Sequence, residues 1–246
     1  MIASLTVFGD ALEFIVDERR LILHKTWEHL LLSGAALAIA LVISLPIGVW
    51  LGHRHRGSFL AVNVANLGRA LPSLAVIAVG FVFIGVGFWS VAIALVVLAI
   101  PPILTNAYVA VDAVQTEAVE AARGMGMTDR QIITRIELPL ALPLIFAGIR
   151  TATVFVVATA TIAAVAGGGG LGDIIVNQAA YGLEGVVGAA ICVSVLALVA
   201  DGAVGLLQRA LTPAGLRVES RSFEADVTTS GLRFRPSMSK VDGLPD

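Results

Sequence analysis

The sequence contains little charge and almost no cysteine. Only 14% of its 246 residues are charged, whereas about a quarter are charged in soluble domains, and 57% are hydrophobic, with a mean hydropathy of +0.92. The single cysteine, Cys192, excludes a disulfide framework within the chain and a cysteine-based metal cluster. A net charge of −2 without a concentrated basic face argues against nucleic-acid binding. These absences predict an integral membrane protein.

Motifs for catalysis and nucleotide binding are also missing. The chain has no GxxxxGK[ST] loop, and residues 167–170, four glycines without a following lysine, are expected to form a flexible loop or gate element. The four histidines lack a spacing with carboxylates that suits zinc on a helix face, and His53 and His55, which alternate with arginines, are expected to be solvated. No set of acid, base and nucleophile is found. We therefore expect no enzymatic activity, metal or cofactor in this chain.

Charge-free runs predict an all-α integral membrane fold with about five transmembrane helices, because a bilayer core of about 30 Å takes roughly 20 apolar residues. The expected spans are residues 30–52, 58–84, 88–112, 138–166 and 185–210. The long run 57–111 must reverse at residues 85–87, which include two glycines. In the third span, Pro101 and Pro102 are expected to kink the helix and free backbone carbonyls.

The two ends of the chain differ from this membrane domain, residues 29–212. Residues 1–28 lack the basic n-region of a signal peptide and are expected to remain as an amphipathic, interfacial segment with Trp27 as its anchor. Residues 213–246 are rich in Ser, Thr, Arg and Asp, with few apolar residues. This composition predicts a disordered cytoplasmic tail.

The distribution of Lys and Arg in short loops predicts an outside N-terminus and a cytoplasmic C-terminus. Eight basic residues then lie inside and three outside. The inside set is Arg54, Arg56, Arg123, Arg130, Arg135, Arg209, Arg217 and Arg221, and the outside set is Arg19, Arg20 and Lys25. In this orientation the loop 113–137 is cytoplasmic and the glycine-rich loop 167–182 faces the other side.

The loop 113–137 has an unusual pattern for an exposed segment of so hydrophobic a protein. Residues 117–122 are rich in helix formers and end near glycine, which predicts a short surface helix. Glu120 is followed by two alanines, by glycine six residues on, by isoleucine ten residues later, and then by Leu-Pro. Small alanines let a partner approach the backbone closely, and proline is compatible with the first turn of the next span.

This pattern resembles the EAA loop of permease subunits of ABC importers. The positions that carry the resemblance are Glu120, Ala121, Ala122, Gly126, Ile136, Leu138 and Pro139. It implies a type I importer permease fold in which this loop acts as a coupling helix that docks on a cytoplasmic ATPase. The implied location is the bacterial plasma (inner) membrane.

Further segments resemble the osmoprotectant branch of these permeases, which imports glycine betaine, choline, carnitine or proline. They are residues 29–33, 45–48, 70–75, 147–152 and 168–173. The implied partners are a dimer of ATP-binding subunits, a second permease subunit that is either a copy or a sister chain, an extracytoplasmic substrate-binding protein and the lipid bilayer. A permease for another small solute, such as an amino acid or a sulfonate, stays open, as do a passive channel or a scaffold.

Three charged residues fall inside the expected spans: Arg69, Arg150 and Asp201. Each lies roughly 15–18 Å along its helix from the cytoplasmic side. Because charge at membrane depth is costly, we hypothesise that Asp201 pairs with Arg150 or Arg69 and fixes helix packing or one state of a gate. The alternative is that these helices project beyond the bilayer, so that the charges reach the headgroups.

Polar residues within the spans are the candidates for a solute pathway. They are Asn63, Asn66, Ser73, Asn106, Thr159 and Thr161. Such residues also hold membrane helices together, so each is a weak candidate alone. A quaternary ammonium is normally recognised by aromatic faces, and with three Trp, two Tyr and ten Phe a dense aromatic cage is not expected here. Selectivity is therefore assigned to the binding protein.

Overall fold

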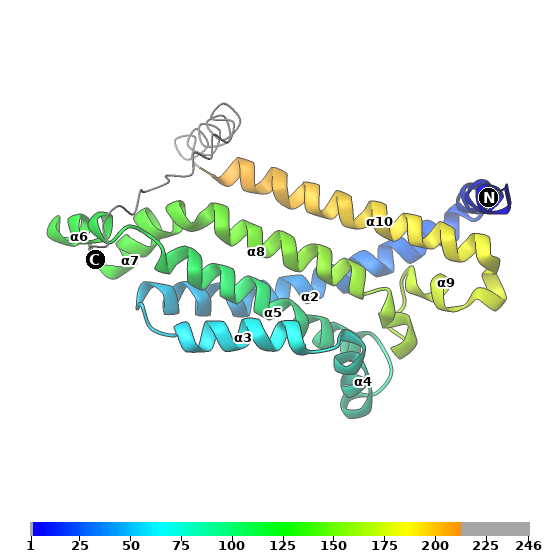
Figure 1. Ribbon diagram of the computed structural model, residues 1–246, viewed down its shortest axis with the longest axis horizontal. Helices are drawn as coiled ribbons and strands as arrows, with labels where there is room; N and C mark the ends of the chain where they lie inside the picture. Colours follow the sequence, from blue (N-terminus) through cyan, green and yellow to red (C-terminus); the bar gives the residue numbers. More distant parts are fainter. Residues whose placement is uncertain (1, 213–246) are drawn as a thin grey trace, which may run out of the picture. The chain divides into compact units, whose positions relative to one another are not determined.

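The computed structural model describes residues 2–212, and all regular structure in that range is helical (Figure 1). Four helical stretches are long and apolar enough to cross a bilayer, and a bent helix pair makes a fifth crossing if it counts as one span. This confirms the predicted all-α membrane fold. The predicted tail, residues 213–246, lies outside the described residues.

The N-terminal region forms two helices, α1 (Ile2–Asp17) and α2 (Arg19–His53). The stretch expected to lie at the interface is thus divided near Glu18, and its second part is continuous with the first long apolar helix. Helix α1 packs against the last long helix, α10 (Gln178–Leu211), where Gly188 allows it a close approach. Trp27, the expected anchor, is exposed on α2.

The segment expected to be one span at 58–84 is broken into α3 (Ser58–Ala70) and α4 (Ser73–Ile84), which are bent by 91°. Pro72 explains the break, because a residue before proline is disfavoured in the helical region. Leu71 is accordingly extended, with ψ 116°. The chain then reverses through Gly85 and Gly87, which have φ of 97° and 129°.

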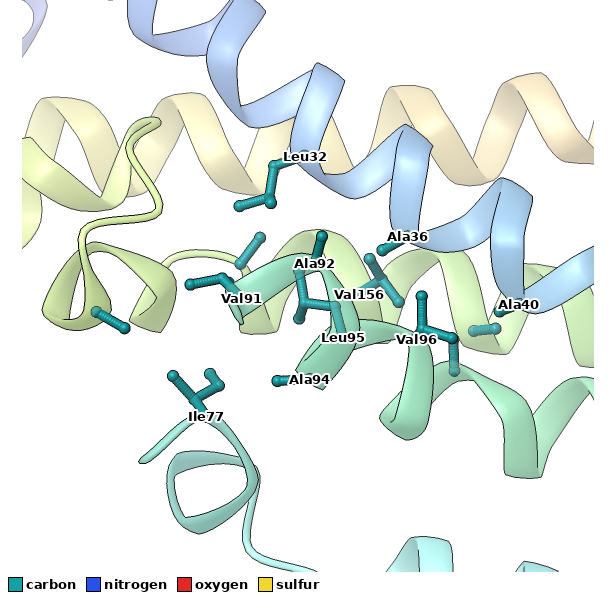
Figure 2. Packing of buried hydrophobic residues seen from close by; sticks show 14 of the residues in the cluster. Leu32, Ala36, Ala40, Ile77, Val91, Ala92, Ala94, Leu95, Val96 and Val156 are labelled. Carbon is teal, nitrogen blue, oxygen red and sulfur yellow. The ribbon is translucent and has the colours of Figure 1, made fainter. Parts of the chain in front are cut away.

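Helix α5 (Phe88–Asp112) is the centre of the packing and contacts α2, α3, α4 and α8 (Leu138–Thr159). Figure 2 shows the core they share: Leu32, Ala36 and Ala40 of α2 face Ala92 and Val96 of α5, with Val156 of α8 beside them, and Ala94 lies on the side of Ile77 of α4. Small residues let membrane helices approach closely. This core positions the cavity described below.

The C-terminal half continues with short elements before the last long helix. Helix α8 ends at Thr159, short of the expected 166, and a 3₁₀ turn η2 (Ile162–Ala166) and α9 (Gly172–Val176) follow. Helix α10 then begins seven residues before the expected span, and it is kinked at Gly182, which has φ of 67°.

Two glycines of α2 differ in their surroundings: Gly48 lies on a face that is closely packed, and Gly34 lies on a face that is open. A Cβ on Gly48 would lie 2.7 Å from the Ala107 Cβ and 2.8 Å from the Leu104 carbonyl oxygen, whereas a Cβ on Gly34 would meet nothing within 4 Å. Backbone cannot move aside as a flexible side chain can.

We therefore expect Gly48→Ala to destabilise the protein by about 1–3 kcal/mol through overpacking. Gly34→Ala, the matched control on the same helix, should be neutral or stabilising by up to about 1 kcal/mol. Thermal unfolding of the detergent-solubilised variants measures both. Equal melting temperatures for the two variants would contradict the close packing of α2 on α5.

Candidate functional site

The loop 113–137, called the docking loop below, folds around a small apolar core of its own. It contains α6 (Thr116–Gly124), α7 (Asp129–Ile132) and a π-helical turn η1 (Ile133–Glu137). Val119 and Ala122 of α6 pack on Ile132 of α7. Thr128 and Gln131 cap α7 reciprocally, the Thr128 amide donating to Gln131 Oε1 at 2.8 Å. The loop is therefore a built surface element.

The residues predicted in this loop divide into an outer and an inner set. Glu120 and Ala121 are exposed, whereas Ala122 is buried against α7. Gly126 has φ of 80°, a conformation that favours glycine, and opens to solvent. Ile136 is half-buried against the loop core.

Helix α8 begins directly at the end of the docking loop. Leu138 is its first residue and Pro139 its second. Because the preceding π-turn runs directly into α8, Pro139 withholds an N–H from a carbonyl of that turn. With α7 and η1, α8 forms one helical stretch, Asp129–Thr159. The loop and α8 are thus mechanically continuous.

A buried pair ties the docking loop to α2. His53 Nδ1 donates to both Glu137 carboxylate oxygens at 2.9 Å, and the two side chains are only 4% and 2% exposed. The expectation that His53 is solvated is wrong, because Glu137, 84 residues away, covers it. His55 is half-exposed as expected and bonds Asp112 at 2.9 Å. The partner of His53 has no local signal in the sequence.

A cavity of about 620 Å³ opens between α3, α4, α5 and α8. The residues known to line it, among side chains that the structure describes, are uncharged: Ala65, Gly68, Leu71, Ser73, Leu98, Pro101, Pro102, Thr105, Asn106, Thr151 and Phe155. A lining of hydroxyls, an amide and apolar groups suits a small polar solute.

Two prolines of α5, Pro101 and Pro102, line this cavity and interrupt the hydrogen bonding of their helix. Neither has an N–H, so the carbonyls of Val97 and Leu98 lack their usual helical donors, and Leu98 lines the cavity. The Asn106 amide donates to the Pro102 carbonyl at 2.7 Å, which orients its side chain.

The predicted pathway residues are only partly brought together. Ser73 and Asn106 line the cavity, whereas Thr159 is buried at the end of α8 and Thr161 donates to the Ala158 carbonyl at 2.7 Å beyond it. Asn66 is exposed on α3 outside the lining. Asn63, also exposed on α3, donates to the Phe59 carbonyl.

Two further polar residues, Thr105 and Thr151, also line the cavity. They could not be predicted as pathway residues, because nothing in the sequence distinguishes them from threonines that only bond their own helix.

Arg150 and Asp201 meet at the seam between α8 and α10. The guanidinium makes a bidentate pair with the carboxylate, Nε to Oδ1 at 2.8 Å and Nη2 to Oδ2 at 2.6 Å. Arg69 lies on α3, which packs on α5, and its side chain is outside what the structure describes. Of the two pairings predicted for Asp201, the structure shows the one with Arg150.

The glycine-rich loop docks on the opposite end of α2 from His53. Glu28 accepts the Gly170 N–H at 2.9 Å, and Lys25 bridges Glu28 and Asp173 at 2.9 and 2.7 Å. Beneath it, the buried His29 donates from Nε2 to the Val157 carbonyl at 2.9 Å. The end of the loop expected to be flexible is therefore held by specific bonds.

Comparisons with known proteins identify the family of this chain. Residues 44–213 match the family model described as "Binding-protein-dependent transport system inner membrane component". The choline transport system permease protein OpuBB of Bacillus subtilis (strain 168) is 38% identical over 197 residues, which are 80% of this chain and 91% of that protein. The carnitine transport permease protein OpuCB of Listeria monocytogenes is 38% identical over 205 residues, 83% and 94% of the two chains.

A solved structure agrees with these relatives. An inward-facing MetNI methionine ABC transporter structure matches with a TM-score of 0.69 and 25% identity, over 80% of this chain and 99% of that one. The fold and cavity define a membrane-embedded permease. The chain belongs to the family of binding-protein-dependent transport system inner membrane components, the permease subunits of ABC importers. The resemblance read from the docking loop is confirmed.

The Arg150–Asp201 pair is tested by exchanging its charges. Asp201→Arg alone places two guanidinium groups together and should lower the melting temperature, while adding Arg150→Asp should restore it, because contacting residues are not additive. Ser194→Ala, an exposed position on the same helix, serves as the control and should behave like the parent. If the double variant is no better than the single one, the pair does not fix the packing of α8 on α10.

Proposed function

We propose that this permease imports a small compatible solute, glycine betaine, choline, carnitine or proline, using ATP hydrolysed by a separate subunit. The observation that carries the proposal is the continuity of one helical stretch, Asp129–Thr159, from the docking loop to the cavity. Thr151 and Phe155, which line the cavity, lie on this same helix. About 20 Å separates Glu137 from Thr151 along it.

In this proposal the exposed face of α6 is the contact with the ATP-binding subunit. Glu120 and Ala121 are exposed there, and the small alanine admits a partner close to the backbone. The loop core of Val119, Ala122 and Ile132 makes the surface rigid enough to transmit a push into α8. An ATPase dimer closing on ATP would then move α8 and alter the cavity.

The remaining assembly follows from the same proposal. The docking loop faces the cytoplasm of a bacterial inner membrane, with the N-terminus outside and the C-terminus inside. A second permease subunit, a copy or a sister chain, completes the path, and an extracytoplasmic substrate-binding protein delivers the solute. The polar lining residues Ser73, Thr105 and Asn106 supply the path in this chain.

The choice of solute is supported by the relatives, whose names specify choline and carnitine. Among the described residues that line the cavity, Phe155 is the only aromatic one. An aromatic cage for a quaternary ammonium requires several aromatic faces. Selectivity is thus placed mainly in the binding protein. An amino acid is the second candidate, favoured by the structural similarity to a methionine transporter.

Reversing the charge of Glu120 tests the docking role. Glu120→Arg should reduce solute uptake about tenfold or more, because a docking contact of this kind is worth at least 1.4 kcal/mol. Glu117→Arg, also exposed on α6, is the matched control and should stay near the parental rate. Uptake of labelled glycine betaine into cells that lack their own systems measures both. Unchanged uptake by Glu120→Arg would favour a passive channel instead.

Competition experiments test the solute class. Uptake of labelled glycine betaine by the complete transporter should be inhibited by excess choline, carnitine or proline. Methionine and taurine should leave it unchanged, because both carry a primary ammonium group, whereas glycine betaine, choline and carnitine carry a quaternary ammonium and proline a secondary one. Inhibition by methionine alone would move the assignment to an amino-acid importer.

A further inference from the structure

The His53–Glu137 pair lies where three structural units meet. His53 is the last residue of α2, and Glu137 is the last residue of the docking loop, immediately before α8. Both carboxylate oxygens are 2.9 Å from His53 Nδ1. His53 Nε2 also faces Asp129 of α7, at 3.8 Å from Oδ1. One buried imidazole therefore contacts both ends of the α7–η1 segment.

Stability alone does not account for such a pair. Removing two ionisable groups from water costs about as much as their attraction returns, and well-packed apolar residues often replace a buried pair without loss. What apolar residues cannot reproduce is direction, because a hydrogen bond fixes distance and angle. The pair thus holds Glu137 at one position relative to α2.

The end of α2 is itself rigidly held by α5. A Cβ on Gly52 would lie 2.8 Å from the Tyr108 carbonyl oxygen and 2.8 Å from the Val111 Cβ, so the two helices touch through their backbones here. A displacement of Glu137 would therefore reach α2 and α5 together. Helix α5 carries Pro101, Pro102 and Asn106 of the cavity lining.

We propose that His53 and Glu137 are positioning residues that transmit movement of the docking loop to the α2–α5 unit, in parallel with the direct route along α8. The inference rests on the proposed contact of the docking loop with the ATP-binding subunit. Motion from one loop then reaches two walls of the cavity, α5 through the pair and α8 through its own helix.

The test measures solute imported per ATP hydrolysed, in liposomes containing the permease with its ATP-binding subunit and binding protein and supplied with labelled glycine betaine. His53→Leu with Glu137→Met keeps an apolar, filled site and should fold. Its ATP hydrolysis should stay within about twofold of the parent while the solute-to-ATP ratio falls about fivefold, within the range of single coupling contacts. His53→Gln with Glu137→Gln restores a neutral hydrogen bond and should recover part of the ratio.

The matched control removes the neighbouring exposed pair, His55 and Asp112, with the double variant His55→Gln and Asp112→Asn. This variant should leave the solute-to-ATP ratio unchanged, because exposed pairs contribute little. A parallel fall of hydrolysis and import in the apolar variant, or an unchanged ratio, would overturn the inference. Glu120→Arg in the same preparation separates the two proposals. If it leaves binding of the ATP-binding subunit intact, the docking role itself fails, whatever the apolar variant does.

Discussion

The close approach of α2 and α5 is the contact on which the other parts of the fold depend. Gly48 and Gly52 allow the two backbones to touch, and Ala36 and Ala40, further toward the start of α2, pack in the core that α2 shares with α5. Lipid tails are as apolar as the helices, so association depends on tight van der Waals packing and not on release of water. Helices α3, α4 and α8 pack around α5, and the cavity lies between them beside the proline pair of α5.

Backbone hydrogen bonding explains where the helices break. A polar backbone group facing hydrocarbon is costly, so irregular backbone is tolerated where protein buries it or where it lines a cavity. The break at Leu71 and the proline pair in α5 both contribute to the cavity lining. The glycine-rich loop is satisfied differently, through the Glu28 carboxylate on α2. These three interruptions therefore contribute to the cavity or are held by a side chain of α2.

The docking loop could be predicted from sequence because its pattern is local. Glu120 to Pro139 lies within one short segment, and the spacing of small, acidic and proline residues reflects a surface helix leading into a span. The approximate positions of the spans could be predicted from the absence of charge, whereas the residues at which the helices begin and end could not. Pro72 was visible, but a proline permits either a kinked span or a right-angled break, and only the packing of α3 and α4 on α5 selects the 91° bend.

A side-chain partner far away in sequence can be predicted only where few candidates compete for it. Arg150 and Asp201 were identifiable as candidates because charge is rare in these helices, whereas His53 looked like part of a solvated basic cluster. Sequence by itself determined the membrane class, the docking loop and the family resemblance, since each rests on composition or local spacing. The tertiary structure alone decided that His53 is buried on Glu137 and that Thr105 and Thr151 line the cavity with Asn106, because burial depends on which helices lie side by side.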